Sequence, residues 1–212
     1  MLTDDKLESI VTGTIRLRTK PVDKLVVRSL EDGIRIWEDK DVKSFYYDKS
    51  MKWQPKNRTA VFLPCSAWKP YPYSPSHKDG YLKALLPYLR RVDLFVVSEP
   101  MTIVPYCYSD EYPIDSYEYD PTKFFMGSLR EPLASHALDV FVSRLADWVG
   151  KFNARYETRI LILPRSWHLR IFHRALERAG ISKEHYSTVR LPGRARNNVE
   201  SLRKSLKLLL EE

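Results

Sequence analysis

Residues 60–77 read AVFLPCSAWKPYPYSPSH, and this stretch decides the fold. Its first four residues, 60–63, are continuously apolar, which is typical of a strand buried on both faces of a parallel sheet. A polar, proline-rich loop follows directly, and apolar residues then recur at helical spacing over 79–90. A strand, a loop and a helix in this order predict one repeating unit of an α/β fold.

The same order recurs along the chain. Residues 94–97 and 160–163 are further apolar runs that predict buried strands, and a short strand is expected at 187–191. Helices are expected from Pro132 to residue 152, from the N-cap Ser166 to Gly180, and over residues 199–209. We therefore predict a mainly parallel sheet with helices on both faces, in a three-layer α/β/α arrangement.

Two polar loops follow strands of this predicted sheet. One loop begins after Leu63, and the other is expected to run without regular structure from Ser98 to about Arg130. Ligands of open parallel sheets bind beyond the carboxyl ends of the strands, so we expect the functional site between these two loops.

The first 57 residues lack this alternation. We interpret 1–57 as an N-terminal accessory segment packed on a core domain at 58–212, with short strands at 25–27 and 34–37.

Charge is distributed unevenly over the 212 residues, whose formal net charge is +8. The stretch from Lys151 onward holds 14 Lys and Arg against 6 Asp and Glu, which accounts for the whole excess. A basic C-terminal third favours a polyanionic partner such as RNA, although such composition also serves solubility alone.

The cysteine content and the lengths of the apolar runs indicate the cellular compartment of the protein. Cys65 and Cys107 form no disulfide framework and have no neighbouring zinc-ligand spacing, so we expect no metal. No apolar run approaches a membrane span, and the N-terminus does not resemble a signal peptide. These features predict a cytoplasmic protein without a membrane partner.

The first loop resembles a known signature. It fits the pattern PCSxxKPYxxSxSH of archaeosine synthase, an archaeal tRNA-modifying enzyme, from Pro64 to His77. The second loop, from Ser98 to Pro105 and on to Tyr112, is similar to that family's SPLGxVP…YP segment, with Thr102 in place of a glycine. Larger family members also carry a transglycosylase-like region and an RNA-binding PUA domain, so the resemblance implies either a minimal version of the enzyme or one subunit of a split enzyme whose partner subunit carries such a region.

The resemblance implies a reaction. The family acts on tRNA that carries preQ0, a 7-cyano-7-deazaguanine, in the dihydrouridine arm, and adds the amine of free lysine to the nitrile to form an amidine. A radical S-adenosylmethionine enzyme then completes archaeosine. The addition needs no cofactor, and the sequence contains no phosphate loop or dinucleotide fingerprint.

Three residues of the first loop are candidates for the chemistry. Cys65 is a candidate nucleophile that would form a thioimidate, or else a small buried residue at the base of the loop. Lys69 could donate a proton, bind a phosphate or activate the thiol, or it could form a structural ion pair. His77 is a candidate general acid–base, or else a helix cap.

Substrate binding is assigned to other residues of the two loops. Glu99 or Asp115 is proposed to bind the ammonium groups of lysine, and loop tyrosines could stack on a flipped base. The alternative is an ordinary solvated loop. The full predicted set is Pro64, Ser66, Tyr71, Ser74, Ser76, Ser98, Glu99, Val104, Pro105, Tyr112 and Asp115.

Phosphate contacts are expected from the basic C-terminal third, at Arg165, Arg170, Arg190, Arg194 and Arg196. Two other functions stay open: a non-catalytic RNA-binding subunit of a split enzyme, and a glycosidase-like enzyme that processes nucleobases.

Overall fold

The computed structural model describes residues 1–14, 25–119, 132–163 and 167–211. Its centre is a five-stranded sheet with the strand order β3-β2-β1-β4-β5. The strands are β1 (Thr59–Pro64), β2 (Asp93–Ser98), β3 (Thr102–Pro105), β4 (Thr158–Leu161) and β5 (Ser187–Thr188). β1 pairs in parallel with β2 and β4, β4 pairs in parallel with β5, and only β3 is antiparallel to its neighbour among the described pairs.

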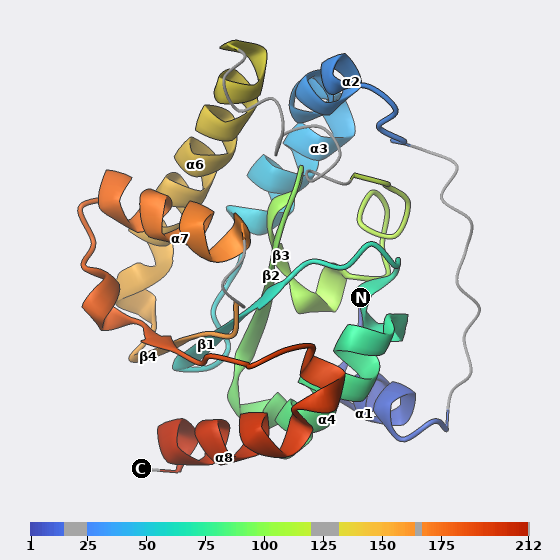
Figure 1. Cartoon of the computed structure of the whole chain (residues 1–212), viewed down its shortest axis with the longest axis vertical. Helices are drawn as coiled ribbons and strands as arrows, with labels where there is room; N and C mark the ends of the chain where they lie inside the picture. The colour runs from blue at the N-terminus through green and yellow to red at the C-terminus, as the bar shows by residue number, and fades with distance from the viewer. Residues whose placement is uncertain (15–24, 120–131, 164–166, 212) are drawn as a thin grey trace.

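Helices cover both faces of the sheet (Figure 1). In Figure 1, α6 and α7 lie together on one side of the sheet, and α4 and α8 lie together on the other. The helices are α1 (Asp4–Val11), α2 (Leu30–Arg35), α3 (Lys40–Ser44), α4 (Lys83–Leu85), α6 (Pro132–Phe152), α7 (Trp167–Arg178) and α8 (Val199–Leu210). The predicted three-layer α/β/α fold with a mainly parallel sheet is confirmed.

Phe62 of β1 shows why the apolar run at 60–63 is a strand buried on both faces. Its ring lies 5.4 Å from the ring of Phe95 on β2, 5.9 Å from Trp148 on α6 and 5.0 Å from Phe172 on α7. The neighbours of Phe62 in β1 point to the opposite face and are equally buried. A strand without a solvated face therefore has no polar alternation in its sequence.

The helix expected at 79–90 is present but irregular. It begins with a π-helical turn at His77–Leu82, continues as α4, and ends as a 3-10 segment at Leu86–Arg91. Pro87, at the start of that last segment, has no N–H to extend an α-helix.

The strand predicted at 34–37 is wrong, because these residues belong to α2 and to a 3-10 turn at Ile36–Glu38. A capping box starts this helix: the Asp32 amide donates to Oγ of Ser29, and the Asp32 carboxylate accepts from the Ser29 amide. Of the strand predicted at 25–27, only a bridge from Val26 to Glu118 is found.

The second loop was also misjudged as wholly irregular. It contains β3, which folds back on β2 with Ser98 opposite Thr102. Thr102 has a φ of +68°, the left-handed region that favours glycine. In the described ranges no helix is long and apolar enough to cross a bilayer.

Candidate functional site

Three parallel strands deliver three polar side chains to one edge of the sheet. Cys65 directly follows β1, Glu99 directly follows β2, and His168 is the second residue of α7, the helix that follows β4. Because β1, β2 and β4 are parallel neighbours, their carboxyl ends lie side by side. The topology therefore brings together residues that are 34 and 103 positions from Cys65 in the chain.

The three side chains form a tight triangle. Sγ of Cys65 lies 3.4 Å from Nε2 of His168 and 3.7 Å from Oε2 of Glu99, and the same Nε2 lies 3.1 Å from Oε2. Glu99 is only 2% exposed, whereas Cys65 is half-buried. The triangle thus has a buried carboxylate at its base and a thiol toward solvent.

Glu99 and His168 stabilise each other's charged forms. Burial raises the pKa of Glu99, but the charge and hydrogen bond of His168 outweigh this and hold that pKa below its usual value. Burial lowers the pKa of His168, but the charges of Glu99 and the Cys65 thiolate raise it well above its usual value. An imidazolium beside a carboxylate is therefore the favoured state of this pair.

Lys69 is a buried amine beside this triangle, with only 4% of the residue exposed. Its Nζ donates a hydrogen bond to the carbonyl oxygen of Ser66 and lies 4.8 Å and 4.3 Å from the ring centroids of Tyr71 and Tyr117. Burial lowers the pKa of Lys69 to about 8, against the opposing charges of Cys65, Glu99 and Glu118. The structure thus holds an amine whose pKa lies well below that of an exposed lysine.

A hydroxyl network lies next to this amine. The hydroxyl of Tyr71 is 2.9 Å from Oγ of Ser98, and the hydroxyl of Tyr117 is hydrogen-bonded to both. All three residues are buried. The network ties the first loop to the end of β2 and fixes the rings below Lys69.

His77 is turned away from the triangle. Its Nδ1 lies 2.9 Å from the Tyr106 hydroxyl, and its Nε2 lies 3.0 Å from the carbonyl oxygen of Pro64. Burial lowers its pKa to about 3, so the ring is neutral at physiological pH. These two contacts hold the first loop in position. His168, which contacts Cys65, is better placed than His77 for the general acid–base role that the sequence suggested.

An open cavity of about 690 Å³ lies in front of the triangle. It is bordered by Cys65 and His168, by Trp68 and Ser76 of the first loop, and by Arg194 and Arg196. Trp68 is 56% exposed, which is unusual for so large an apolar ring. In the described part of the chain, neither guanidinium group forms an ion pair or hydrogen bond with a protein group.

Gly80 positions the side of this cavity that carries Arg194 and Arg196. A methyl group added at Gly80 would lie 2.8 Å from Cβ of Ala195 and 2.8 Å from the backbone nitrogen of Arg196. Only glycine lets the turn at 195–197 pack so closely on the helix that begins at His77. This contact holds the two arginines at the mouth of the cavity.

The other predicted substrate-binding residues lie in three places. Pro64, Ser66, Ser74 and Ser76 belong to the first loop beside the cavity, where Ser74 accepts a hydrogen bond from the His77 amide. Val104 and Pro105 lie in β3, paired with β2. Tyr112 donates to the Asp41 carboxylate, and Asp115 is buried close to Tyr112. Of the two residues proposed to bind the lysine ammonium groups, Glu99 lies 3.7 Å from Sγ of Cys65, and Asp115 lies near Tyr112.

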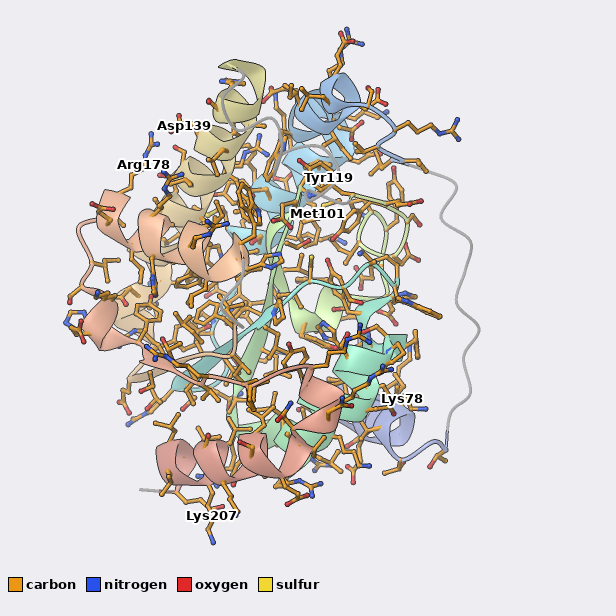
Figure 2. All side chains as sticks on the ribbon, in the orientation of Figure 1. Lys78, Met101, Tyr119, Asp139, Arg178 and Lys207 are labelled. Atoms are coloured by element: carbon orange, nitrogen blue, oxygen red, sulfur yellow. The ribbon has the colours of Figure 1, made fainter. Side chains whose placement is uncertain are left out.

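The predicted phosphate-binding arginines are also divided. Arg194 and Arg196 border the cavity, Arg190 is exposed after β5, and Arg165 lies outside the described residues. Arg170 lines a separate groove of about 620 Å³ between α6 and α7. In Figure 2, Asp139 and Arg178 mark the outer side of these helices, where they form an ion pair of 2.6 Å.

His168 and Trp68 were not singled out by the sequence. Ligand sites of parallel sheets lie beyond the carboxyl ends of the strands, and this rule also applies to β4. The start of α7 follows β4 in the chain, as Cys65 follows β1. A histidine at that position was therefore a usable signal, whereas an exposed tryptophan inside a motif has no distinguishing spacing.

Comparison with known proteins gives a family but no activity. No curated protein matches the chain. The crystal structure of AF0587, a protein of unknown function, is 19% identical with a TM-score of 0.44, over 79% of this chain and 50% of that one. The chain thus spans about half the length of that solved structure.

A family model described as a domain of unknown function, DUF5591, matches residues 42–159. The match includes Cys65 and Glu99, and His168 follows it. It covers more than half of the sequence, and the chain therefore belongs to the DUF5591 family.

Proposed function

We propose that this protein modifies tRNA as archaeosine synthase does, by adding the amine of free lysine to the nitrile of preQ0. The observation that carries the proposal is the contact of Cys65 with His168 at the mouth of a cavity with two arginines that form no ion pair with any residue the structure describes. The family match supports it as well, because DUF5591 is a domain of archaeosine-synthase-type proteins.

The addition would proceed in two steps. In the first, the Cys65 thiolate forms a C–S bond to the nitrile carbon, and the nitrile nitrogen takes a proton from His168 to give a thioimidate. In the second, the lysine amine attacks the same carbon, the C–S bond breaks, and the sulfur regains a proton. The product is an amidine, and nothing is oxidised or reduced.

Lys69 suits the proton transfers of the second step. An attacking amine must lose a proton, and a general base is most effective when its pKa lies near the working pH. The Lys69 amine, with a pKa of about 8, meets this condition. Its place in the loop between Ser66 and Tyr71 keeps it near the thiol.

The cavity has the size and chemistry of a site for a base taken out of the tRNA stack. Its volume of about 690 Å³ exceeds that of a single purine and leaves room for lysine. Trp68 offers a face for stacking, and Arg194 and Arg196 are placed to contact the flanking phosphates. A separate tRNA-binding chain and a radical S-adenosylmethionine enzyme that acts on the product belong to the same proposal.

The decisive experiment incubates the purified chain with preQ0-containing tRNA and isotopically labelled lysine, followed by nucleoside mass spectrometry. A preQ0 nucleoside heavier by one labelled lysine is the expected result, and Cys65→Ala should abolish it while tRNA still binds. An adduct that forms only after a second protein is added would favour a split enzyme. Binding of tRNA without any adduct in either case would contradict the proposed reaction.

A further inference from the structure

We propose that Cys65, Glu99 and His168 bind a thiophilic divalent cation, for which Zn²⁺ is the best match, with a fourth coordination position open to the cavity. Sulfur, imidazole nitrogen and carboxylate oxygen together form a donor set that zinc accepts and that magnesium and calcium do not favour. Three protein ligands leave one coordination position open, unlike the closed four-ligand shell of a structural zinc site.

The distances agree with a metal at the centre of the triangle. Zinc bonds of about 2.3 Å to sulfur and about 2.0–2.1 Å to nitrogen and oxygen place tetrahedral ligands about 3.3–3.6 Å apart. The three ligand atoms are 3.4, 3.1 and 3.7 Å apart. They already lie at the corners of one face of such a tetrahedron, so binding requires movements of only a few tenths of an ångström.

The way the three groups meet is unlike a linear proton relay. In a nucleophile–histidine–acid triad, the acid bonds to Nδ1 and the nucleophile faces Nε2. Here Cys65 and Glu99 both contact the same atom, Nε2 of His168. A single N–H or a single lone pair cannot serve both partners well, whereas a cation between the three atoms satisfies all of them.

Glu99 supplies an independent observation. Its Oε1 is buried and meets hydrogen-bond geometry with no donor among the described residues, although the Trp167 indole N–H, which also lacks a partner there, helps to lower the pKa of this carboxylate. A buried carboxylate oxygen without a partner is unusual and calls for an explanation such as an ion. A bound cation would neutralise this carboxylate and could take Oε1 as a second contact.

Metal binding would regulate the proposed reaction, and this consequence rests on the proposed function. A bound cation withdraws electron density from the sulfur that would attack the nitrile, so coordination lowers the nucleophilicity of the Cys65 thiolate. The thiol of the loaded protein would be protected and less reactive, and loss of the cation would restore the free nucleophile. The cation-binding proposal itself does not depend on that activity.

The test uses Co²⁺ as a coloured substitute for Zn²⁺. The full chain is freed of metal with a chelator, titrated with Co²⁺ and followed by absorption. We expect one equivalent to give a thiolate-to-cobalt band with the visible bands of tetrahedral cobalt, which Zn²⁺ then removes. Cys65→Ser should abolish the thiolate band, and His168→Gln should weaken binding at least about 100-fold.

Two controls keep the cation test specific. Cys107→Ser and His173→Gln, the latter on the same helix as His168, should leave the spectrum unchanged. Circular dichroism of each variant establishes that it is folded. The proposal is overturned if the wild-type chain gives no thiolate band, or if Cys65→Ser retains it. Adduct formation is assayed separately in chelator, so a chain that forms the adduct but binds no Co²⁺ contradicts the metal site alone.

Discussion

The thiol of Cys65 lies 3.4 Å from Nε2 of His168, although 103 positions separate the two residues in the chain. The contact exists because β1 and β4 are parallel neighbours whose following residues meet at one edge. Reactivity of the thiol should therefore depend on a helix that lies beyond the motif at 64–77.

His168→Gln should lower formation of the lysine adduct by at least about 100-fold, because it removes the proton donor beside the thiol. The imidazole lies at the start of α7 and 13% of its side chain is exposed, so the fold should survive. His173→Gln, on the same helix, is the matched control and should keep wild-type activity. Equal loss of adduct in both variants would indicate that α7, rather than the imidazole, was damaged.

Lys69→Met should abolish turnover and change how stability depends on pH. Burial lowers the pKa of Lys69 from 10.5 to about 8, while Cys65, Glu99 and Glu118 oppose the shift and Tyr71 and Tyr117 face the amine. Between pH 8 and 10.5 the unfolded chain binds more protons, so this lysine makes stability rise with pH in that window.

Below pH 8 the full desolvation cost of Lys69 applies, and it amounts to about 3 kcal/mol at most. The methionine variant should therefore gain most over wild type at pH 7, and the gain should shrink toward pH 10. Urea unfolding at both pH values measures this. Lys78→Met serves as the control, and an equal pH dependence of the two variants would contradict the assigned cause.

His77→Gln should make the free energy of unfolding less sensitive to acid pH, and it should leave the activity unchanged. Burial lowers the pKa of His77 from 6.5 to about 3, so its contribution to stability is complete above pH 6.5 and is lost as the pH falls below that value. Between pH 7 and pH 5 the wild type should lose about 2 kcal/mol through this group.

Glutamine can still donate to the Pro64 carbonyl and accept from the Tyr106 hydroxyl, but it does not titrate. Unfolding of both proteins at pH 7 and pH 5 tests the prediction. If the variant instead showed a changed pH profile of adduct formation with unchanged acid stability, His77 would be a participant in the reaction.

Gly80→Ala should weaken tRNA binding and leave the contacts among Cys65, Glu99 and His168 unchanged. The added methyl group meets the backbone of 195–196 at 2.8–2.9 Å, and that backbone must move, which displaces Arg194 and Arg196. Gly150→Ala on α6 meets nothing within 4 Å and should stabilise the helix by about 0.5–1 kcal/mol.

Filter binding over a range of salt concentrations compares the two alanine variants. A shallower salt dependence is expected for Gly80→Ala alone, because fewer phosphates are contacted. Identical slopes would mean that the turn at 195–197 does not contact the RNA backbone.

Thr102→Gly should raise the free energy of unfolding by about 1 kcal/mol, since it relieves a threonine held at a φ of +68°. The Thr102 hydroxyl is also buried without a hydrogen-bond partner among the described residues. Thr102→Val separates the two causes, because it removes the hydroxyl and keeps the backbone conformation. Chemical denaturation is the measurement, and a gain confined to valine would show that the backbone conformation is not the source.

The sequence predicted the central strands and the helices of the core correctly, for a local reason. The apolar run at 60–63 and the stripe at 132–152 are longer and more regular than competing patterns. Weaker patterns failed: residues 34–37 form helix because the Ser29–Asp32 cap decides their conformation, and 102–105 form a strand only because β2 offers them an edge.

By itself the sequence determined that Cys65, Lys69 and Glu99 lie in loops after buried strands. A buried strand and the loop that follows it can both be recognised from consecutive residues. Only the tertiary structure decided that His168 joins Cys65 and Glu99, and that His77 turns away from them. The contacts of His168 depend on which strands are neighbours in the sheet. The orientation of His77 depends on which side chains are buried when the core packs. No local periodicity predicts them, so the spacing of the three possible metal ligands along the chain did not by itself reveal the triangle.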